Sequence, residues 1–254
     1  MNGASRFTGK TAVVTGAAGD LGRTVAGKLL AEGADVTLLD VDARRLEEVA
    51  DTLGGGTRDV HARAVDMTDE DAVAAALSEV AARSGGRLDC FFNNAGIEGP
   101  VRPLTEVDPS DLTRVLQVNV VGVFLGLKYA LPLMGEGGVI VNSGSTASLR
   151  GAPNLAPYVA SKHAVLGLTR SAALEAAERG VRVCAICPGP LEGRMMRDLD
   201  TGRGRLGRNR PPAVGLTTRY GQVGEVAAAV AFLLSDEASF VNGTGFVVDG
   251  GRLA

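Results

Sequence analysis

The sequence predicts a doubly wound parallel α/β sheet of about seven strands, with helices on both faces, in one domain over residues 1–254. Three observations predict it. Short runs rich in β-branched residues alternate with longer helical patterns from end to end. The short runs are almost continuously apolar, as strands covered on both faces are. The first run leads directly into a glycine-rich turn that opens a helix, and right-handed crossovers then give the doubly wound arrangement.

Each expected strand is a short apolar run bounded by glycine or polar residues. In chain order the strands are Thr11–Thr15, Asp35–Leu39, Val60–Val65, Leu88–Phe92, Val139–Asn142, Arg182–Ile186 and Gly245–Val248. The segments between them carry apolar residues at helical spacing. These helices are expected near Leu21–Glu32, Ala43–Leu53, Glu70–Arg83, Ser110–Leu133, Pro157–Arg179 and Gly224–Ser235. We find no linker, repeat or second domain in this pattern.

Composition argues against several classes of protein. The formal net charge of −3 opposes a polyanion-binding surface, and the absence of Trp with only 4% aromatic residues leaves little for base stacking. We therefore expect no nucleic-acid partner. No apolar run reaches the roughly 18 residues needed to cross a bilayer, and residues 1–10 lack the apolar stretch of a signal peptide. These features favour a cytoplasmic protein without a membrane partner.

Cysteine and histidine offer no metal site. Cys184 and Cys187 form a C-x-x-C pattern, but they lie in an expected buried strand, where residues three apart point to opposite faces. We interpret them, like Cys90, as packing residues. His61 and His163 have no metal-ligand spacing, so no metal is expected.

The glycine-rich turn at residues 15–22 is typical of a dinucleotide-binding Rossmann fold. Gly16 and Gly22 lie between the first strand and a helix, where backbone N–H groups can approach a pyrophosphate. The second strand ends at Asp40, where an acid can bind the adenosine ribose. A 2′-phosphate would meet like charge from Asp40 and Asp42, with no basic partner nearby. This favours NAD over NADP by an estimated few kcal/mol.

Tyr158 and Lys162 lie four residues apart in an expected helix, with Ser145 thirteen residues upstream. Residues at this spacing share one helix face, so an ammonium can lie beside a phenol. A phenol has a pKa near ~10, and use near neutrality needs a shift worth about 3–4 kcal/mol. One cation at ~4 Å supplies about that much at an effective dielectric constant of ~20. We expect Lys162 to lower the pKa of Tyr158.

Eight pieces in this order resemble the short-chain dehydrogenase/reductase family over essentially the whole chain. They are Thr15-Gly16 to Gly22, Asp66-Met67, Asn93-Asn94-Ala95-Gly96, Asn119, Ser145, Tyr158-x-x-x-Lys162, Pro188-Gly189 and Val248-Asp249-Gly250-Gly251. The resemblance implies that Tyr158 exchanges the proton with the substrate oxygen, while Ser145 hydrogen-bonds that oxygen. It implies that Lys162 binds the nicotinamide ribose and that Asn119 holds a water linking Lys162 to solvent. A helix kink is the alternative for Asn119.

The resemblance also implies which residues hold the cofactor. The residues expected to contact NAD are Gly16, Asp20, Leu21, Gly22, Asp40, Asp66, Met67, Asn93, Ala95, Gly96, Tyr158, Lys162, Pro188, Gly189 and Leu191. A capping role before the next helix is the alternative for Asp66. Two positions depart from the family pattern: Asp20 replaces a glycine, and Gly193 replaces a threonine that bonds the nicotinamide carboxamide. We expect the turn to tolerate Asp20, because aspartate accepts left-handed backbone better than most residues.

The substrate region is expected at about residues 190–220, a lid over the carboxyl ends of the strands. Its part from Arg197 to Tyr220 is rich in arginine and has few periodic apolar residues, so a solvated insertion is the alternative. Glu98 and Glu192 would suit neutral, hydroxyl-rich substrates. A further group of charges, Arg203, Arg205, Arg208 and Arg210, favours acidic or carrier-linked substrates instead. Small cyclic ketones and their secondary alcohols are our first choice.

The resemblance implies an NAD(H)-dependent oxidoreductase that interconverts a secondary alcohol and a ketone. A 3-oxoacyl-[carrier protein] reductase is one alternative, and a non-catalytic nucleotide sensor is another. The residues Ala160, Ala164, Gly167 and Ser171 form a stripe of small side chains on the helix of Tyr158, facing either the chain's own sheet or another subunit. Members of the family are commonly homotetramers, so we expect a homo-oligomer.

Overall fold

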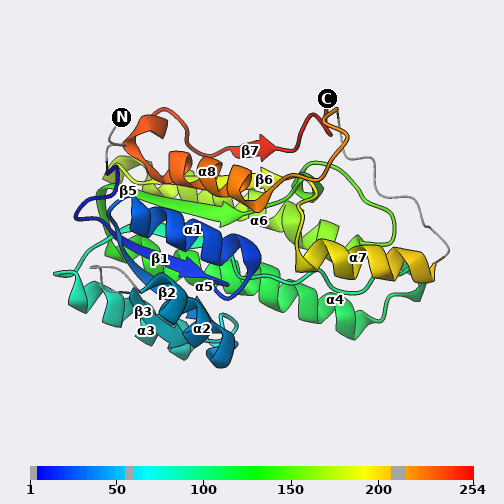
Figure 1. The fold of residues 1–254 in the computed structure, drawn as a ribbon, viewed down its shortest axis with the longest axis horizontal. Coiled ribbons are helices and arrows are strands. Elements are labelled where there is room, and N and C mark those ends of the chain that lie inside the picture. The colour runs from blue at the N-terminus through cyan, green and yellow to red at the C-terminus, as the bar shows by residue number, and fades with distance from the viewer. Residues whose placement is uncertain (1–4, 55–59, 207–215) are drawn as a thin grey trace.

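A computed structural model describes residues 5–54, 60–206 and 216–254 and contains one seven-stranded parallel sheet (Figure 1). The strand order is β3-β2-β1-β4-β5-β6-β7. The strands are β1 (Thr11–Thr15), β2 (Asp35–Asp40), β3 (Val60–Ala64), β4 (Leu88–Asn93), β5 (Met134–Ser143), β6 (Arg182–Pro188) and β7 (Gly245–Val248). This order, with all pairs parallel, confirms the predicted doubly wound sheet.

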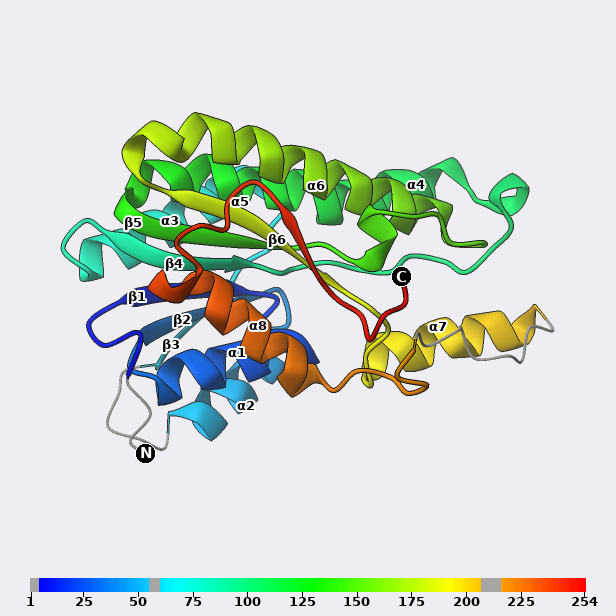
Figure 2. The same ribbon diagram turned by 90° about the horizontal axis from the view of Figure 1, so that it is seen from above.

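Helices cover both faces of the sheet (Figure 2). They are α1 (Asp20–Ala31), α2 (Ala43–Leu53), α3 (Glu70–Arg83), α4 (Pro109–Leu116), α5 (Gly122–Ala130), α6 (Ala156–Ala176), α7 (Arg194–Arg205) and α8 (Val223–Leu234). One core packs α1, α2 and α8 against the sheet, and the other packs α3, α5 and α6 against the opposite face. Neighbouring residues of β1 divide between them, because successive strand side chains alternate: Ala12 and Val14 join the first core and Val13 the second.

The structure differs from the expected elements in three places, the first being β5, which begins at Met134 and not at Val139. The single helix expected at Ser110–Leu133 is divided by a π-helical segment, Gln117–Val121, and ends in a 3₁₀ turn, Leu131–Leu133. The arginine-rich segment, in which we expected no helix, contains α7. The many glycines and arginines of this segment obscure its helical pattern in the sequence, but α7 has a short apolar face on which Leu199 is buried, at 5% exposure. The rest of the expected lid, residues 207–215 with Arg208 and Arg210, lies outside the described residues.

The segment Pro109–Leu133 is long and apolar enough to cross a membrane by length and composition alone. In the fold it contacts α3, α6, β4 and β5. Its buried apolar residues, among them Val123, Leu125 and Leu127, belong to the core beneath the sheet. Packing in this core accounts for the apolar character of these residues.

The three cysteines are buried and free, as expected for packing residues. Cys90 and Cys187 belong to separate apolar clusters, and the thiol of Cys184 donates to the carbonyl of Val241. Burial raises the pKa of each thiol, that of Cys90 to about 12. Protonated thiols of this kind are poor nucleophiles and poor metal ligands.

Candidate active site

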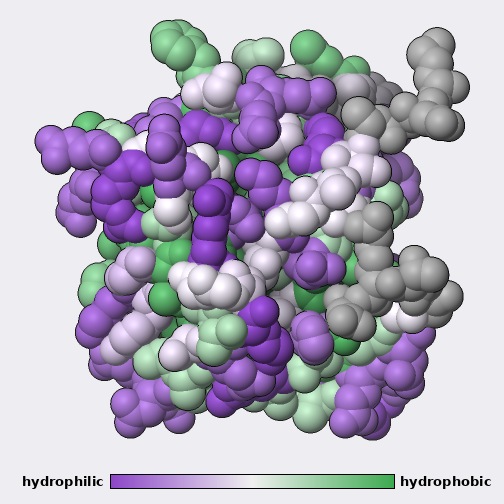
Figure 3. Space-filling view, turned by 90° about the vertical axis from the view of Figure 1, so that its left-hand side faces the viewer, coloured by the Kyte–Doolittle hydropathy of each residue, from purple (hydrophilic) through white to green (hydrophobic). Residues whose placement is uncertain are grey.

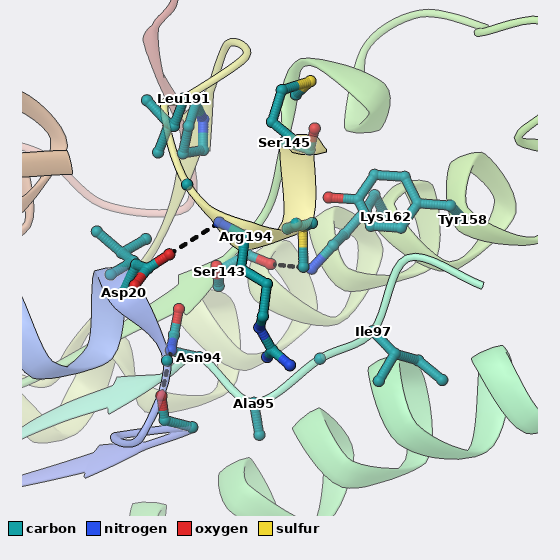
Figure 4. A pocket seen from close by; sticks show the side chains of 18 of the residues that line it. Asp20, Asn94, Ala95, Ile97, Ser143, Ser145, Tyr158, Lys162, Leu191 and Arg194 are labelled. Carbon is teal, nitrogen blue, oxygen red and sulfur yellow. Dashed lines mark hydrogen bonds between the residues drawn. The ribbon is translucent and has the colours of Figure 1, made fainter. Parts of the chain in front are cut away.

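A cleft of about 630 Å³ lies at the carboxyl ends of the strands (Figure 4). It opens where the sheet order reverses, between β1 and β4, the point at which doubly wound sheets bind ligands. The opposite end of the sheet, where the strands begin, presents a largely hydrophilic surface (Figure 3). The predicted site residues that line the cleft are Gly16, Asp20, Leu21, Asp40, Asp66, Met67, Ala95, Gly96, Ser145, Tyr158, Lys162, Pro188, Gly189 and Leu191.

Three predicted site residues, Gly22, Asn93 and Asn119, do not line the cleft. Gly22 lies beneath the turn, where a Cβ would come within 2.2 Å of the Gly16 carbonyl oxygen, so it allows α1 to approach β1. Asn93 is buried in the sheet layer, outside the lining of the cleft. Its amide is 1% exposed and donates to Val123 O and Asn142 Oδ1, so it braces β4 against α5 and β5.

The glycine turn fits a bound pyrophosphate. Gly16 has a φ of +62°, which few residues other than glycine adopt easily. Gly19, the N-cap of α1, supplies no side-chain hydrogen bond to the first-turn amides, and Gly19, Asp20 and Leu21 all face the cleft. Uncapped N–H groups at a helix N-terminus bind phosphate well, because they also carry the positive end of the helix dipole.

The turn is held by the neighbouring strands. Thr15 Oγ1 accepts hydrogen bonds from the backbone of Asn94 and Ala95, at 2.8 and 3.0 Å. The Asn94 amide donates in turn to the carbonyls of Thr15 and Gly16. Asn94 thereby joins the carboxyl ends of β1 and β4 at the floor of the cleft.

Asp40 lies at the adenosine end, where its carboxylate accepts from the backbone N–H of Ala18 at 2.9 Å and of Asp42 at 3.0 Å. The expectation that no basic group lies near is wrong, because Arg45 of α2 also lines this end. Asp66 accepts from the backbone and hydroxyl of Thr68, while Asp69 caps α3. Asp69, and not Asp66, is therefore the N-cap of α3, and Asp66 lines the cleft.

Ser145, Tyr158 and Lys162 converge at the other end. Ser145 follows β5 and caps a short 3₁₀ turn, while Tyr158 and Lys162 project from one face of α6. The Lys162 ammonium lies 5.5 Å from the centroid of the Tyr158 ring and donates to the Ser143 carbonyl at 2.7 Å. The hydroxyl groups of Ser145 and Tyr158 face the same part of the cleft (Figure 4).

The expectation that Lys162 lowers the pKa of Tyr158 is not met by the protein alone. Burial raises the pKa of Tyr158 to about 12, a hydrogen bond with Ser145 opposes this rise, and the charge of Glu98 adds to it. Burial also lowers the pKa of Lys162 to about 8. Removal from water is the largest cause of both pKa shifts.

Asn119 is fully buried in the π-helical segment. Its Oδ1 accepts from Ile97 N at 2.8 Å, and its Nδ2 donates to Ile97 O at 2.8 Å and to Ser161 Oγ at 3.0 Å. These bonds tie the segment after β4 to α6 directly below Tyr158. The π segment interrupts the helix at Asn119, which agrees with the kink interpretation.

The start of α7 forms one wall of the cleft, within the expected lid at about residues 190–220, but sequence reasoning missed its helix and its lining residues. Arg194, Met195, Met196 and Leu199 line it. The spacing of Met195, Met196 and Leu199 is a weak helical signal that could have found this wall. Of the two carboxylates expected near the substrate, Glu192 lines the cleft and accepts from Gln222, and Glu98 affects the site through its charge on Tyr158.

Among the residues that the structure describes, no three His, Cys, Asp or Glu side chains form a group that could hold a metal ion. His163 lies on α6, with its Nδ1 2.9 Å from the carbonyl of Val159.

Relatives of this chain span nearly its whole length. A family model described as Enoyl-(Acyl carrier protein) reductase matches residues 16–252. Levodione reductase from Leifsonia aquatica is 40% identical over 258 residues, covering 98% of this chain and 96% of its own. Cyclohexanol dehydrogenase from Acinetobacter sp. (strain SE19) is 38% identical over 251 residues, covering 97% and 96%.

Solved structures agree with this chain in fold. A crystal structure of levodione reductase has a TM-score of 0.90 at 39% identity, covering 97% of this chain and 98% of its own. NAD+-bound xylitol dehydrogenase has a TM-score of 0.89 at 32% identity, covering 96% and 99%. A short chain dehydrogenase from Burkholderia cenocepacia J2315 in complex with NADP has a TM-score of 0.87 at 34% identity, covering 98% and 100%. The chain belongs to the short-chain dehydrogenase/reductase family, as its motifs predict.

Proposed function

We propose that this protein is an NAD(H)-dependent oxidoreductase that interconverts a secondary alcohol and a ketone. The observation that carries the proposal is the convergence of Ser145, Tyr158 and Lys162 in one cleft with the uncapped glycine turn. Ser145, Tyr158 and Lys162 supply groups for proton transfer, and the turn supplies a phosphate site. When bound, the nicotinamide accepts or supplies the hydride.

Tyr158 is protonated at neutral pH, because burial raises its pKa to about 12, so it carries the proton that a ketone oxygen takes up during reduction. Ser145 orients that oxygen by a hydrogen bond. Lys162, held by Ser143 at 2.7 Å, presents a cation beneath the phenol and toward the expected ribose. In the oxidation direction Tyr158 must lose its proton first, which makes that direction the more dependent on a neighbouring positive charge.

NAD is the proposed cofactor rather than NADP. Asp40 occupies the place of a ribose-binding acid, and its two hydrogen bonds to backbone hold the carboxylate there. A 2′-phosphate would meet this fixed charge, although Arg45 lines the same end of the cleft. Family members of both kinds are known, since one structural relative is bound to NAD+ and another to NADP.

The substrate we propose is a small cyclic ketone or its alcohol. Ile97, Val118, Leu155, Met195 and Leu199 give the reacting end an apolar lining, which suits a hydrocarbon ring. Two relatives are a levodione reductase and a cyclohexanol dehydrogenase, names that agree with such a substrate.

The test is the absorbance of reduced nicotinamide with a panel of cyclic and linear ketones, alcohols and a 3-oxoacyl thioester, using each cofactor. We expect turnover with NAD(H) and cyclic substrates. Preference for NADPH and the thioester would favour a 3-oxoacyl-[carrier protein] reductase. Tight NAD binding without turnover across the panel would favour a nucleotide sensor.

We further propose that the protein is a homotetramer. Along α6, Ala160, Gly167 and Ser171 are exposed, so the stripe of small residues faces away from the chain's own sheet. Leu174 continues this stripe and is 79% exposed, and Phe240, before β7, is fully exposed. A contiguous exposed face of small and apolar side chains is typical of a surface that a partner covers. Light scattering after size exclusion would give the mass, and a monomer at micromolar concentration would refute the proposal.

A further inference from the structure

Two residues 174 positions apart meet at the cofactor end of the cleft. The Asp20 carboxylate accepts a hydrogen bond at 3.0 Å from the backbone N–H of Arg194, the first residue of α7 (Figure 4). Asp20 is also the first residue of α1, directly after the uncapped turn. The contact therefore fixes the start of α7 beside the expected phosphate site.

Asp20 creates an electrostatic difficulty at that site. Its carboxylate adds negative charge where a pyrophosphate must bind, and like charges at this range repel. Arg23 pairs with Oδ1 at 2.9 Å, but the Arg23 side chain is 54% exposed, so solvent and salt weaken this compensation. A further cation near the turn would offset the charge of Asp20 toward a dianion.

Arg194 can supply that cation. Figure 4 shows its side chain extending from the start of α7 into the cleft, between Asp20 and Lys162 and over the segment that carries Ala95. Within the described parts of the chain its guanidinium has no hydrogen-bond or ion-pair partner. A guanidinium offers donors in a planar fork that matches phosphate oxygens.

The neighbouring residue leaves room for this arrangement. A Cβ on Gly193 would come within 2.9 Å of Asp20 Oδ2, so a side chain at that position would displace the carboxylate from Arg194 N. Glycine at 193 and aspartate at 20 are thus compatible with each other.

We propose that Arg194 binds the pyrophosphate of the dinucleotide from the α7 side, and that Asp20 is the positioning residue that holds Arg194 there. This inference rests on the proposed function only in requiring a dinucleotide in the cleft. It links cofactor binding to the wall of the substrate site, because Met195 and Leu199 belong to the same helix.

The experiment measures binding of NAD, ADP-ribose and adenosine by calorimetry, which needs no tryptophan signal. Arg194→Gln should weaken NAD and ADP-ribose about tenfold, the effect of losing one charge-assisted hydrogen bond, and change adenosine less than about twofold. The dependence of ADP-ribose binding on ionic strength should become less steep. Arg194→Lys should lose less affinity. Arg197→Gln, one turn along α7 and outside the cleft lining, is the matched control and should bind as the wild type does.

Asp20→Asn and Asp20→Ala distinguish the hydrogen bond that Asp20 accepts from Arg194 N from the negative charge of its carboxylate. The asparagine oxygen can still accept from Arg194 N while the like charge is removed, so ADP-ribose should bind at least as well as to the wild type. Asp20→Ala loses the anchor and should make the Arg194→Gln substitution less costly. Unchanged ADP-ribose affinity in Arg194→Gln would overturn the inference. A raised KM for the ketone with unchanged NAD affinity would also overturn it, because Arg194 would then contact the substrate. Failure of the wild type to bind ADP-ribose would instead refute the proposed cofactor.

Discussion

At the adenosine end of the cleft the polar groups are backbone N–H groups and solvent-accessible carboxylates, whereas at the reacting end they are side chains that the fold removes from water. Asp66 is exposed and Asp40 is half-buried, but Lys162 is 5% exposed and Asn119 is fully buried. The first end recognises a ligand at little cost in stability. The second end destabilises the fold, because burial raises the pKa of Tyr158 and lowers that of Lys162.

The difference teaches where stability and function oppose each other. A residue at the adenosine end can be changed with consequences confined to cofactor choice. Substituting a buried charged residue at the reacting end should lower turnover strongly and raise the free energy of unfolding, since a buried charge destabilises the fold.

The largest effect is expected for Tyr158→Phe. The variant should lose about 10²–10⁴-fold in kcat, the usual range for a general acid or base, while its NAD affinity stays within about twofold. Steady-state kinetics and calorimetry provide the two measurements. Tyr129→Phe is the control, because that hydroxyl bonds Glu70 on the surface. Full turnover in Tyr158→Phe would remove the phenol from the reaction.

Lys162→Met should lose activity and gain stability. The pKa of Lys162 is about 8 in the folded state against 10.5 as its ordinary value, a cost of roughly 3 kcal/mol, from which the lost bond to Ser143 subtracts about 1–2 kcal/mol. Chemical denaturation at pH 7 should therefore show a variant roughly 1–2 kcal/mol more stable than the wild type.

The pH dependence of the free energy of unfolding tests the same effect of burial on Lys162. Between pH 8 and about 10 the unfolded wild type binds the proton that the folded state has released, so its stability should rise with pH relative to Lys162→Met. Below pH 8 the difference should be constant. Lys128→Met, at a lysine 46% exposed, should show no such window. A variant less stable than the wild type at every pH would contradict the role of burial.

Asp40→Asn tests the adenosine end. The amide oxygen can still accept from Ala18 N, so the turn should keep its shape while the charge is lost. NADP should bind about tenfold more tightly and NAD somewhat more weakly, with Tm changed little. Asp51→Asn, at an exposed position of α2 outside the cleft lining, is the matched control. An unchanged ratio of the two affinities would mean that Arg45 or another group decides cofactor choice.

The smallest effect is expected for Glu98→Gln. Removing this charge should lower the pKa of Tyr158, because Glu98 is one cause of its rise. The limb of the pH–rate profile that reports Tyr158 should move to lower pH, with kcat at its plateau nearly unchanged. Glu106→Gln, on the exposed 3₁₀ turn Leu104–Glu106, should leave the profile in place. A shift to higher pH would show that Glu98 does not act through its charge.

The sequence by itself determined the sheet, the glycine turn and the identity of the reacting residues. Each depends on spacing along the chain: alternation places Val13 in one core and its neighbours in the other, a positive φ requires Gly16, and a four-residue interval puts Tyr158 and Lys162 on one face. Such local requirements are recorded in neighbouring residues, and they could be predicted.

Only the tertiary structure decided the contacts between distant segments. The bond from Arg194 to Asp20, the bracing role of Asn93 and the apolar face of α7 each depend on residues that no local pattern relates. The same holds for the sign of the Tyr158 pKa shift, since spacing predicts a neighbouring cation but not how much water the fold excludes. Desolvation is a property of the packed cleft, and it outweighs the attraction that the sequence predicts.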